Sequence, residues 1–206
     1  MENIEEQLES YCLYLKLIHE RMLDKFFKEQ APYLCCKKGC SHCCEKGQYP
    51  MSEIEFLYIM LKFSAQNEQI KEEVLNNIQM LIREKNECGL NSKDFFYKCP
   101  FLINNFCCVY DNRAIICRTH GLMFFIEDND GDEKYKIPYC VNLNLNYSKV
   151  YDKNLKTITD ELIEKSGINI KPHVYNISLK TLTKKEITKN LGFQFGEFKP
   201  LIEWFM

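Results

Sequence analysis

Cysteine side chains are the most crowded reactive groups in this sequence. The segment CCKKGCSHCC, residues 35–44, holds five of the twelve cysteines in a chain of 206 residues. Thiolates bind soft metal ions and act as nucleophiles, and two thiols can be oxidised to a disulfide. The crowding therefore predicts a disulfide framework, a metal site or a reactive thiol centre.

The disulfide framework is disfavoured by the spacing of the cysteines and by the expected compartment. Three pairs are adjacent in sequence: Cys35–Cys36, Cys43–Cys44 and Cys107–Cys108. Adjacent Cα atoms lie about 3.8 Å apart, whereas a disulfide needs roughly 4.4–6.8 Å. The first ten residues, MENIEEQLES, are acidic where a secretory signal is basic and then apolar. We therefore expect a cytoplasmic protein with reduced thiols.

Composition argues against two other classes of protein. No apolar run approaches the ~18 residues that a transmembrane helix needs, so we expect no membrane association. The net charge is −2 at pH 7 and the pI is near 6.1, which argues against nucleic-acid binding driven by overall charge. With 46% hydrophobic residues, the chain can bury a core without covalent cross-links.

The spacing of the cysteines favours a metal site. Four of them follow the pattern C-x3-C-x2-C-C, with Gly39 at the bend of a short loop that can direct several thiolates to one point. Downstream, Cys99 and Cys107 flank Asn104-Asn105, a tight-turn signal that should bring these two cysteines together. The predicted metal ligands are Cys36, Cys40, Cys43, Cys44, Cys99, Cys107, Cys117 and Cys140.

These eight thiols leave the number and the type of metal site open. They could complete two separate four-thiolate zinc sites, or fewer of them could hold one iron–sulfur cluster. Because adjacent side chains diverge in an extended chain, Cys43 and Cys44 are not expected to bind one ion together.

Cationic and imidazole groups lie beside the cysteines in sequence. Four thiolates around Zn²⁺ carry a net charge of −2, which Arg113 and Arg118 are suited to compensate. Lys37 and Lys38 serve the same purpose or are simply solvated. His120 is a candidate ligand or general base, against the ordinary alternative of a solvated or packed imidazole. A redox-active thiol sensor, with thiols of low pKa beside the two lysines, is a third hypothesis.

The segments before and between the cysteines read as helices. Apolar residues recur at steps of three and four through residues 2–29, which predicts one long amphipathic helix that ends at Ala31-Pro32. Ser52 and Glu55 form a capping-box pattern, so a second helix should begin there. Residues 67–87 predict a third helix, with Gly89 as its stop signal.

The second half of the chain predicts a β-hairpin and weaker helices. The segments GLMFFIED and KYKIPYC flank the turn NDGDE, which lacks the ligand spacing of a calcium loop and reads as a solvated turn. Residues 156–166 and 178–191 are predicted helices. The apolar end of the chain, FKPLIEWFM, should pack onto the body of the protein, with an exposed partner-binding tail as the alternative.

Together these elements predict a mainly α fold of the α+β class. We expect a helical bundle with a small antiparallel β-hairpin element, organised around a cysteine-rich metal site. Residues 1–206 are expected to form a single domain, in which 30–145 are the cysteine-cluster core and 146–206 a C-terminal helical extension.

The order of the cysteines and their neighbours resembles the YkgJ family of cysteine-cluster proteins, described as zinc- or iron-chelating domains. The resemblance covers Cys36 to Arg118, or as far as Cys140, and includes CPFL, CCVYDNR and ICR as well as the loop. Ala114 departs from it, since the family has proline there. The resemblance implies a metal held by cysteines, either zinc or an iron–sulfur cluster. It also extends to flagellin lysine N-methylases, which implies an alternative function: iron–sulfur-dependent modification of a protein partner or substrate.

Overall fold

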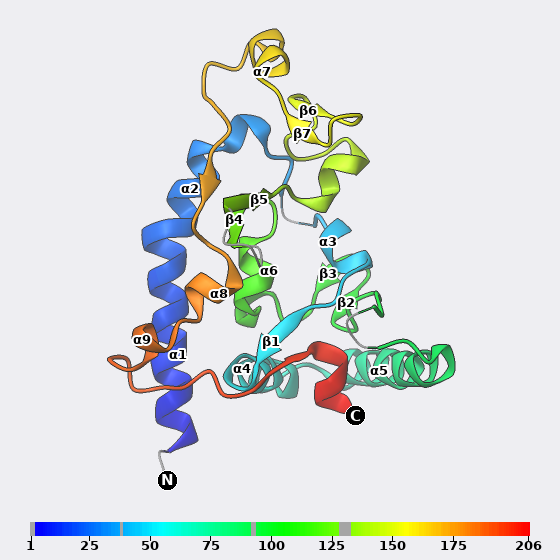
Figure 1. Cartoon of the computed structure of the whole chain (residues 1–206). Coiled ribbons are helices and arrows are strands. Elements are labelled where there is room, and N and C mark those ends of the chain that lie inside the picture. The colour runs from blue at the N-terminus through cyan, green and yellow to red at the C-terminus, as the bar shows by residue number, and fades with distance from the viewer. Residues whose placement is uncertain (1–2, 38, 92–93, 128–132) are drawn as a thin grey trace. The chain divides into compact units, whose positions relative to one another are not determined.

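The computed structural model describes residues 3–37, 39–91, 94–127 and 133–206, and it has an α+β architecture (Figure 1). Helices make up about half of the chain, and the sheets are small and mainly antiparallel. This confirms the expected fold class at that level.

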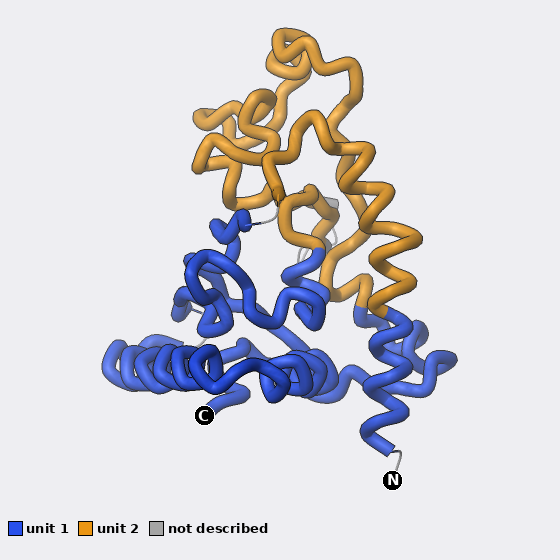
Figure 2. Tube along the Cα trace, turned by 180° about the vertical axis from the view of Figure 1, so that it is seen from behind, with its two compact units in different colours: residues 1–14, 39–118, 183–206 blue, residues 15–38, 119–182 orange. Residues whose placement is uncertain are grey.

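The chain divides into two compact units, drawn in different colours in Figure 2. Unit 1 contains Met1–Tyr14, Gly39–Arg118 and Thr183–Met206, and unit 2 contains Leu15–Lys38 and Thr119–Leu182. Neither unit is one continuous stretch of sequence, so this division differs from the expected boundaries near residues 30 and 145. The single domain over residues 1–206 stays a prediction.

The expected N-terminal helix is confirmed over residues 4–29. It consists of α1 (Ile4–Ile18), a single π-helical segment η1 (His19–Leu23) and α2 (Asp24–Glu29). A short 3-10 helix, η2 (Ala31–Tyr33), follows at the predicted stop. Proline in that segment lacks the N–H that a continuing helix would need.

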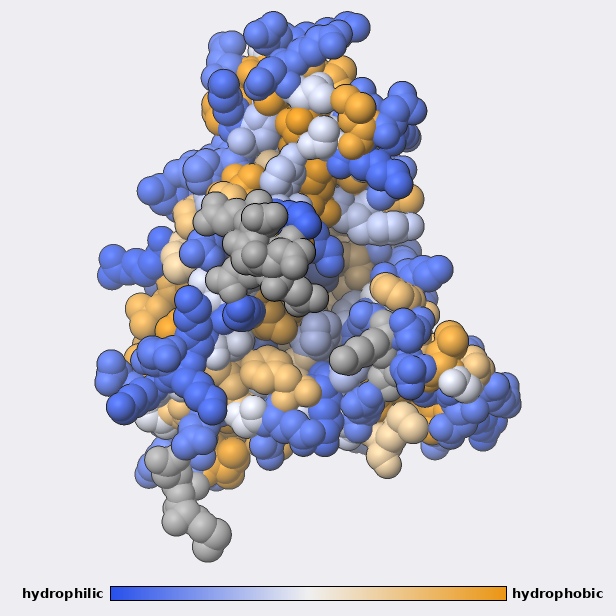
Figure 3. Space-filling model, in the orientation of Figure 1, coloured by the Kyte–Doolittle hydropathy of each residue, from blue (hydrophilic) through white to orange (hydrophobic). Residues whose placement is uncertain are grey.

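Two capped helices, α4 (Glu53–Ser64) and α5 (Glu68–Cys88), lie in unit 1. Helix α4 begins with a complete capping box between Ser52 and Glu55, as the sequence predicted. Helix α5 has Asn67 as its N-cap and ends at Gly89, whose φ of 62° suits a residue without a Cβ. The inward face of α5 contributes Val74, Ile78 and Leu81 to the core, and its outer surface is largely hydrophilic (Figure 3).

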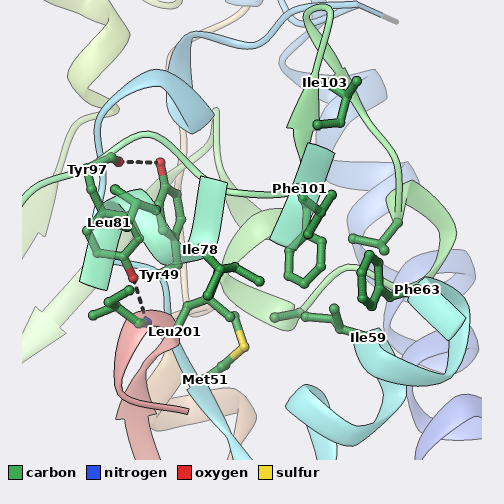
Figure 4. Close-up of a cluster of buried hydrophobic side chains, with 14 of the residues drawn as sticks. Tyr49, Met51, Ile59, Phe63, Ile78, Leu81, Tyr97, Phe101, Ile103 and Leu201 are labelled. Atoms are coloured by element: carbon green, nitrogen blue, oxygen red, sulfur yellow. Dashed lines mark hydrogen bonds between the residues drawn. The ribbon is translucent and has the colours of Figure 1, made fainter. Parts of the chain in front are cut away.

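The core of unit 1 is built from α4, α5 and segments that lie far away in sequence. Figure 4 shows Ile59 and Phe63 from α4 packed near Phe101, with Leu201 from the C-terminal segment in the same cluster. Strand β1 (Pro50–Ser52) pairs with β9 (Phe198–Pro200), and η5 (Leu201–Phe205) follows directly. The expected packing of the apolar C-terminal segment is therefore confirmed.

Short elements carry four of the predicted ligands of unit 1: Cys43, Cys44, Cys107 and Cys117. Helix α3 (His42–Glu45) precedes β1, and the hairpin of β2 (Leu102–Ile103) and β3 (Phe106–Cys107) turns at Asn104-Asn105. Both asparagines have positive φ, 48° and 64°, which confirms the predicted tight turn. The segment η3 (Tyr110–Asn112) and helix α6 (Ile115–Thr119) follow.

Unit 2 contains the predicted hairpin of β4 (Met123–Glu127) and β5 (Glu133–Lys136). Its turn, residues 128–132, lies outside the described residues. Strand β8 (Val174–Tyr175) pairs with β4 in parallel, and β6 (Tyr151–Asp152) pairs with β7 (Thr157–Ile158).

The weaker helix predictions are confirmed only in part. Helix α7 (Asp160–Ser166) starts later than the predicted residue 156, because residues 157 and 158 belong to β7. The predicted helix over 178–191 is divided into α8 (Leu179–Leu182) and α9 (Lys185–Thr188).

Candidate functional site

The eight predicted ligands are divided between the two units. Cys36 and Cys140 belong to unit 2, whereas the other six belong to unit 1: Cys40, Cys43, Cys44, Cys99, Cys107 and Cys117. All twelve cysteines are free thiols. The geometry of each unit is therefore described separately.

Helix α3 brings two sulfurs of unit 1 together. Gly39, with a φ of 89°, turns the chain before the helix, and the Cys44 N–H donates to the Ser41 carbonyl at 2.7 Å. The sulfur atoms of Cys43 and Cys44 are 3.9 Å apart. The expectation that these neighbours diverge is wrong, because it assumed extended chain. On a helix, successive side chains are about 100° apart rather than on opposite faces.

Backbone pairing places the downstream cysteines beside this helix. The Cys99 N–H donates to the Cys44 carbonyl at 2.8 Å, which ties the two cysteine-bearing segments directly. The Asn104-Asn105 hairpin pairs Cys107 with Leu102, and the Leu102 N–H donates to the Cys99 carbonyl at 3.0 Å. The predicted approach of the Cys99 and Cys107 segments across the turn is thereby confirmed.

Five of the predicted ligands in unit 1 act on one another electrostatically, and Cys108, which was not a predicted ligand, interacts with Cys99 and Cys107 as well. We call the five predicted ligands the five-thiol group: Cys43, Cys44, Cys99, Cys107 and Cys117. Burial raises the pKa of Cys99, and the nearby Cys117 and Cys107 raise it further. Burial raises the pKa of Cys117 to about 12, again with Cys107 and Cys43 adding to the rise. A cation among these thiols would relieve their mutual repulsion.

The Cys43–Cys44 pair differs from the rest of the group. The hydrogen bond between the two thiols lowers the pKa of Cys43 to about 7 and raises the pKa of Cys44. Burial and the charges of Cys99 and Cys117 also raise the pKa of Cys44. The pair thus favours a single thiolate on Cys43, facing a neutral Cys44.

Arg113 supplies positive charge to three of these thiols, Cys43, Cys107 and Cys117. Burial raises the pKa of Cys107 and of Cys117, and the charge of Arg113 opposes the rise in both. The guanidinium lies 3.5 Å from the ring centroid of Tyr110, and its Nε donates to the Tyr110 carbonyl at 2.9 Å. Arg118 donates from its Nε to the Arg113 carbonyl at 2.8 Å. Within the described residues, neither arginine forms an ion pair with a carboxylate.

Cys40 is exposed, and its loop lies against the hairpin. A Cβ added at Gly39 would be 3.6 Å from the ring of Phe106, the residue before Cys107. The loop and the hairpin therefore approach each other at Gly39 and Phe106, the residues directly before Cys40 and Cys107. Of the loop lysines, Lys38 lies outside the described residues.

Tyr49, which the sequence did not single out, and Glu55, which it indicated only as a helix cap, hold this region together. The Tyr49 hydroxyl donates to the Cys44 carbonyl at 2.8 Å and lies 3.2 Å from the Tyr97 carbonyl, as Figure 4 shows for the tyrosine pair. The Glu55 side chain is fully buried and accepts from the Ile115 N–H at 2.8 Å, two residues before Cys117. The capping-box pattern located Glu55 but gave no sign of this second role.

In unit 2, a buried amide holds Cys36. Asn146, which is 1% exposed, donates from Nδ2 to the Cys36 sulfur at 3.0 Å and to the Gly121 carbonyl at 3.0 Å. Its Oδ1 accepts from the Cys35 N–H at 2.7 Å. A Cβ on Gly121 would come within 2.7 Å of the same sulfur, so only glycine leaves room for it. His120 and half-buried Cys140 also belong to unit 2.

The thiols of the described residues do not form a completed coordination geometry. Across residues 3–37, 39–91, 94–127 and 133–206, no three Cys, His, Asp or Glu side chains are placed to hold a metal ion. Each cysteine has one side-chain torsion with three staggered positions, so the sulfur atoms can still move without movement of the backbone.

No family model, curated protein or solved structure matches this chain. The resemblance to the YkgJ family therefore stays a prediction. In the described part of the chain, none of the helices combines the length and the apolar character needed to cross a membrane.

Proposed function

We propose that the protein binds a soft metal through the five-thiol group of unit 1, with Cys43 and Cys44 among the ligands. The supporting observation is the separation of 3.9 Å between these two sulfurs. Zn–S bonds of ~2.3 Å in a tetrahedron place neighbouring sulfurs about 3.8 Å apart. The helical pair therefore already has the spacing of two zinc ligands.

The electrostatics of the group favour a bound cation. Several thiols share a partly buried region in which each raises the pKa of its neighbours, so they cannot ionise together without added positive charge. A divalent metal supplies that charge. Arg113 would compensate part of the remaining net charge, since its guanidinium already acts on Cys43, Cys107 and Cys117.

Zinc and an iron–sulfur cluster are both compatible with thiolate ligands. The Cys43–Cys44 separation favours a single zinc ion, with two further ligands from Cys99, Cys107 and Cys117. The number of thiols, five together with the nearby Cys40, favours a cluster that needs cysteines spread over a larger volume. Cys36 and Cys140 of unit 2 stay predicted ligands. The protein-modifying alternative rests on the family resemblance and also stays a prediction.

The first experiment is elemental analysis with an absorption spectrum of protein purified without oxygen. We expect close to one zinc per chain and a colourless protein. Iron with sulfide and a visible absorption band would instead identify the cluster. Protein that contains neither metal and takes up neither on reconstitution would overturn the proposal.

Serine variants locate the ligands. Cys44→Ser and Cys117→Ser should lower the metal content or weaken its retention against a chelator by at least tenfold. Cys88→Ser is the matched control, because its exposed thiol donates to the Lys85 carbonyl in α5, outside the five-thiol group. Equal metal loss in all three variants would show that the five-thiol group is not the site.

A further inference from the structure

Unit 2 contains a pocket of about 480 Å³ that is separate in sequence from every cysteine of the five-thiol group. Its volume lies within the range of roughly 300–1,000 Å³ that is typical of small-molecule sites. The pocket is lined by β5, by η4 (Tyr139–Leu143) and the two residues before it, and by β6, β7 and the turn between them, all of which belong to unit 2.

The lining combines positive charge with aromatic rings. The charged and aromatic residues of the lining are three lysines and three tyrosines: Lys134, Lys136, Lys156, Tyr135, Tyr139 and Tyr151. Among the described residues, the lining contains no aspartate or glutamate. Lys136 and Lys156 have no ion-pair partner within the parts of the chain that the structure describes, so their positive charge would favour a bound anion.

The lysines of the lining come from β5 and from the β6–β7 turn. Lys134 and Lys136 are two residues apart in β5, so their side chains leave the same face of the strand. Lys156 lies in the β6–β7 turn with a φ of 54°, a conformation uncommon for residues other than glycine. Neither Lys136 nor Lys156 forms an ion pair with any residue that the structure describes.

The two sides of the pocket are joined by a hydrogen bond. The hydroxyl groups of Tyr135 on β5 and Thr157 on β7 lie 2.6 Å apart. The nearby Asp152 carboxylate is occupied within its own turn, where it accepts from the Asn154 and Leu155 N–H groups at 2.8 and 2.9 Å. Asp152 is thus held in the turn and does not line the pocket.

The aromatic rings are available to a ligand. Tyr139 is 66% exposed and Tyr135 is 39% exposed. Tyrosine rings stack on planar heterocycles, and lysine binds phosphate as a compact point charge.

We propose that this pocket binds a small anion in which a phosphate is joined to an aromatic ring, with a nucleoside phosphate as the class that fits best. Lys136 and Lys156 bind the phosphate, and Tyr139 stacks on the base. The proposal does not depend on the five-thiol group, because none of its residues belongs to that group.

Calorimetric titration of the full-length protein with AMP and ATP tests the proposal directly, with adenosine and inorganic phosphate as the two partial ligands. We expect AMP or ATP to bind at least tenfold more tightly than either partial ligand. The absence of detectable binding of both nucleotides at millimolar concentration would overturn the proposal. Phosphate binding as tight as that of AMP would also overturn it, because the aromatic ring would then contribute nothing.

Two double variants test whether these particular lysines bind AMP or whether any positive charge on unit 2 is sufficient. Lys136→Met combined with Lys156→Met should weaken AMP binding at least tenfold, whereas Lys165→Met combined with Lys171→Met should leave it unchanged. All four lysines are exposed residues of unit 2, so the two double variants remove equal charge. Equal weakening in both would contradict the proposal. Tyr139→Ala should weaken binding and Tyr139→Phe should restore it, while unchanged circular dichroism confirms folding in each case.

Discussion

Glu55 connects two helices of unit 1 through its side chain. Its Oε2 accepts from the N–H and the hydroxyl of Ser52 at the start of α4, both at 2.7 Å, and its Oε1 accepts from the Ile115 N–H in α6. Because Cys117 lies two residues after Ile115, this buried carboxyl group helps to set where that thiol lies. A charged or polar group can be buried without loss of stability only if its hydrogen bonds are made.

Glu55→Gln should lower the free energy of unfolding by about 1–3 kcal/mol, the typical cost of an unpaired buried polar group. Glutamine has one acceptor oxygen, so its NH₂ group would face a backbone N–H donor. Urea denaturation measures the change. Glu72→Gln is the control, since Glu72 is an exposed residue of α5. Equal stability of the two variants would show that these hydrogen bonds contribute little.

The difference in the free energy of unfolding between the native protein and Glu55→Gln should depend on pH in a defined direction. Burial raises the pKa of Glu55, although its hydrogen bonds oppose the rise. A pKa that is higher in the folded than in the unfolded state gives stability at low pH that is lost as pH rises through the folded pKa. The stability advantage of the native protein over Glu55→Gln should therefore shrink as pH rises above the ordinary glutamate pKa of about 4.3. An advantage that grows with pH would contradict the raised pKa.

At the scale of elements, the C-terminal segment is linked to helix α3 through two tyrosines. The Leu201 N–H donates to the Tyr49 carbonyl at 3.1 Å, and the Ile202 N–H donates to the Tyr97 hydroxyl at 3.0 Å. The Tyr49 hydroxyl in turn donates to the Cys44 carbonyl. Strand pairing of β9 with β1 reinforces the same connection. The end of the chain thus stabilises the position of α3.

Tyr49→Phe should weaken metal binding by roughly three- to tenfold, equivalent to about 1 kcal/mol for the lost hydrogen bonds. The ring remains in the core, so the fold is kept while the hydroxyl beside Cys44 is removed. Competition with a chromophoric chelator measures the affinity. Tyr58→Phe is the control, because its hydroxyl contacts Cys12 rather than the five-thiol group. Unchanged affinity in Tyr49→Phe would mean that the hydroxyl supports only the fold.

Local signals in the sequence predicted the elements that local chemistry determines. The Ser52 cap, the Asn67–Gly89 helix and the Asn104-Asn105 turn are each encoded within a few residues. The pairings of β1 with β9 and of β4 with β8 were not predicted. They join segments about 150 and 50 residues apart, and no short sequence pattern indicates which distant strands pair.

The candidate site was predictable to a similar extent. The turn beside Cys99 and Cys107 indicated that their segments approach each other, and cysteine spacing indicated that the loop belongs with them. The helical conformation of Cys43 and Cys44 was missed, because a four-residue helix gives no periodic signal. The separation of Cys36 and Cys140 into unit 2 depends on long-range packing, which spacing alone does not reveal.

At the scale of the whole molecule, metal removal should act on unit 1. Structural zinc sites contribute apparent binding free energies of ~10–16 kcal/mol, which are lost when the ion is chelated. Trp204, the only tryptophan, packs against the core of unit 1 and stacks on Phe56, so its fluorescence reports on that unit. A strong chelator should lower the midpoint of thermal unfolding followed by Trp204, and added zinc should restore it. An unchanged midpoint after complete metal removal would exclude a structural metal.

The interleaved path of the chain has a consequence for synthesis on the ribosome. Unit 2 is complete once residue 182 has emerged, but unit 1 also requires residues 183–206. Domains generally fold as they are made. The thiols of unit 1 are synthesised before β9, so their surroundings stay incomplete until β9 has been made and can pair with β1. The thiols of unit 1 therefore stay exposed in the nascent chain until residues 183–206 have emerged, and an ion that binds early would shield them during that interval.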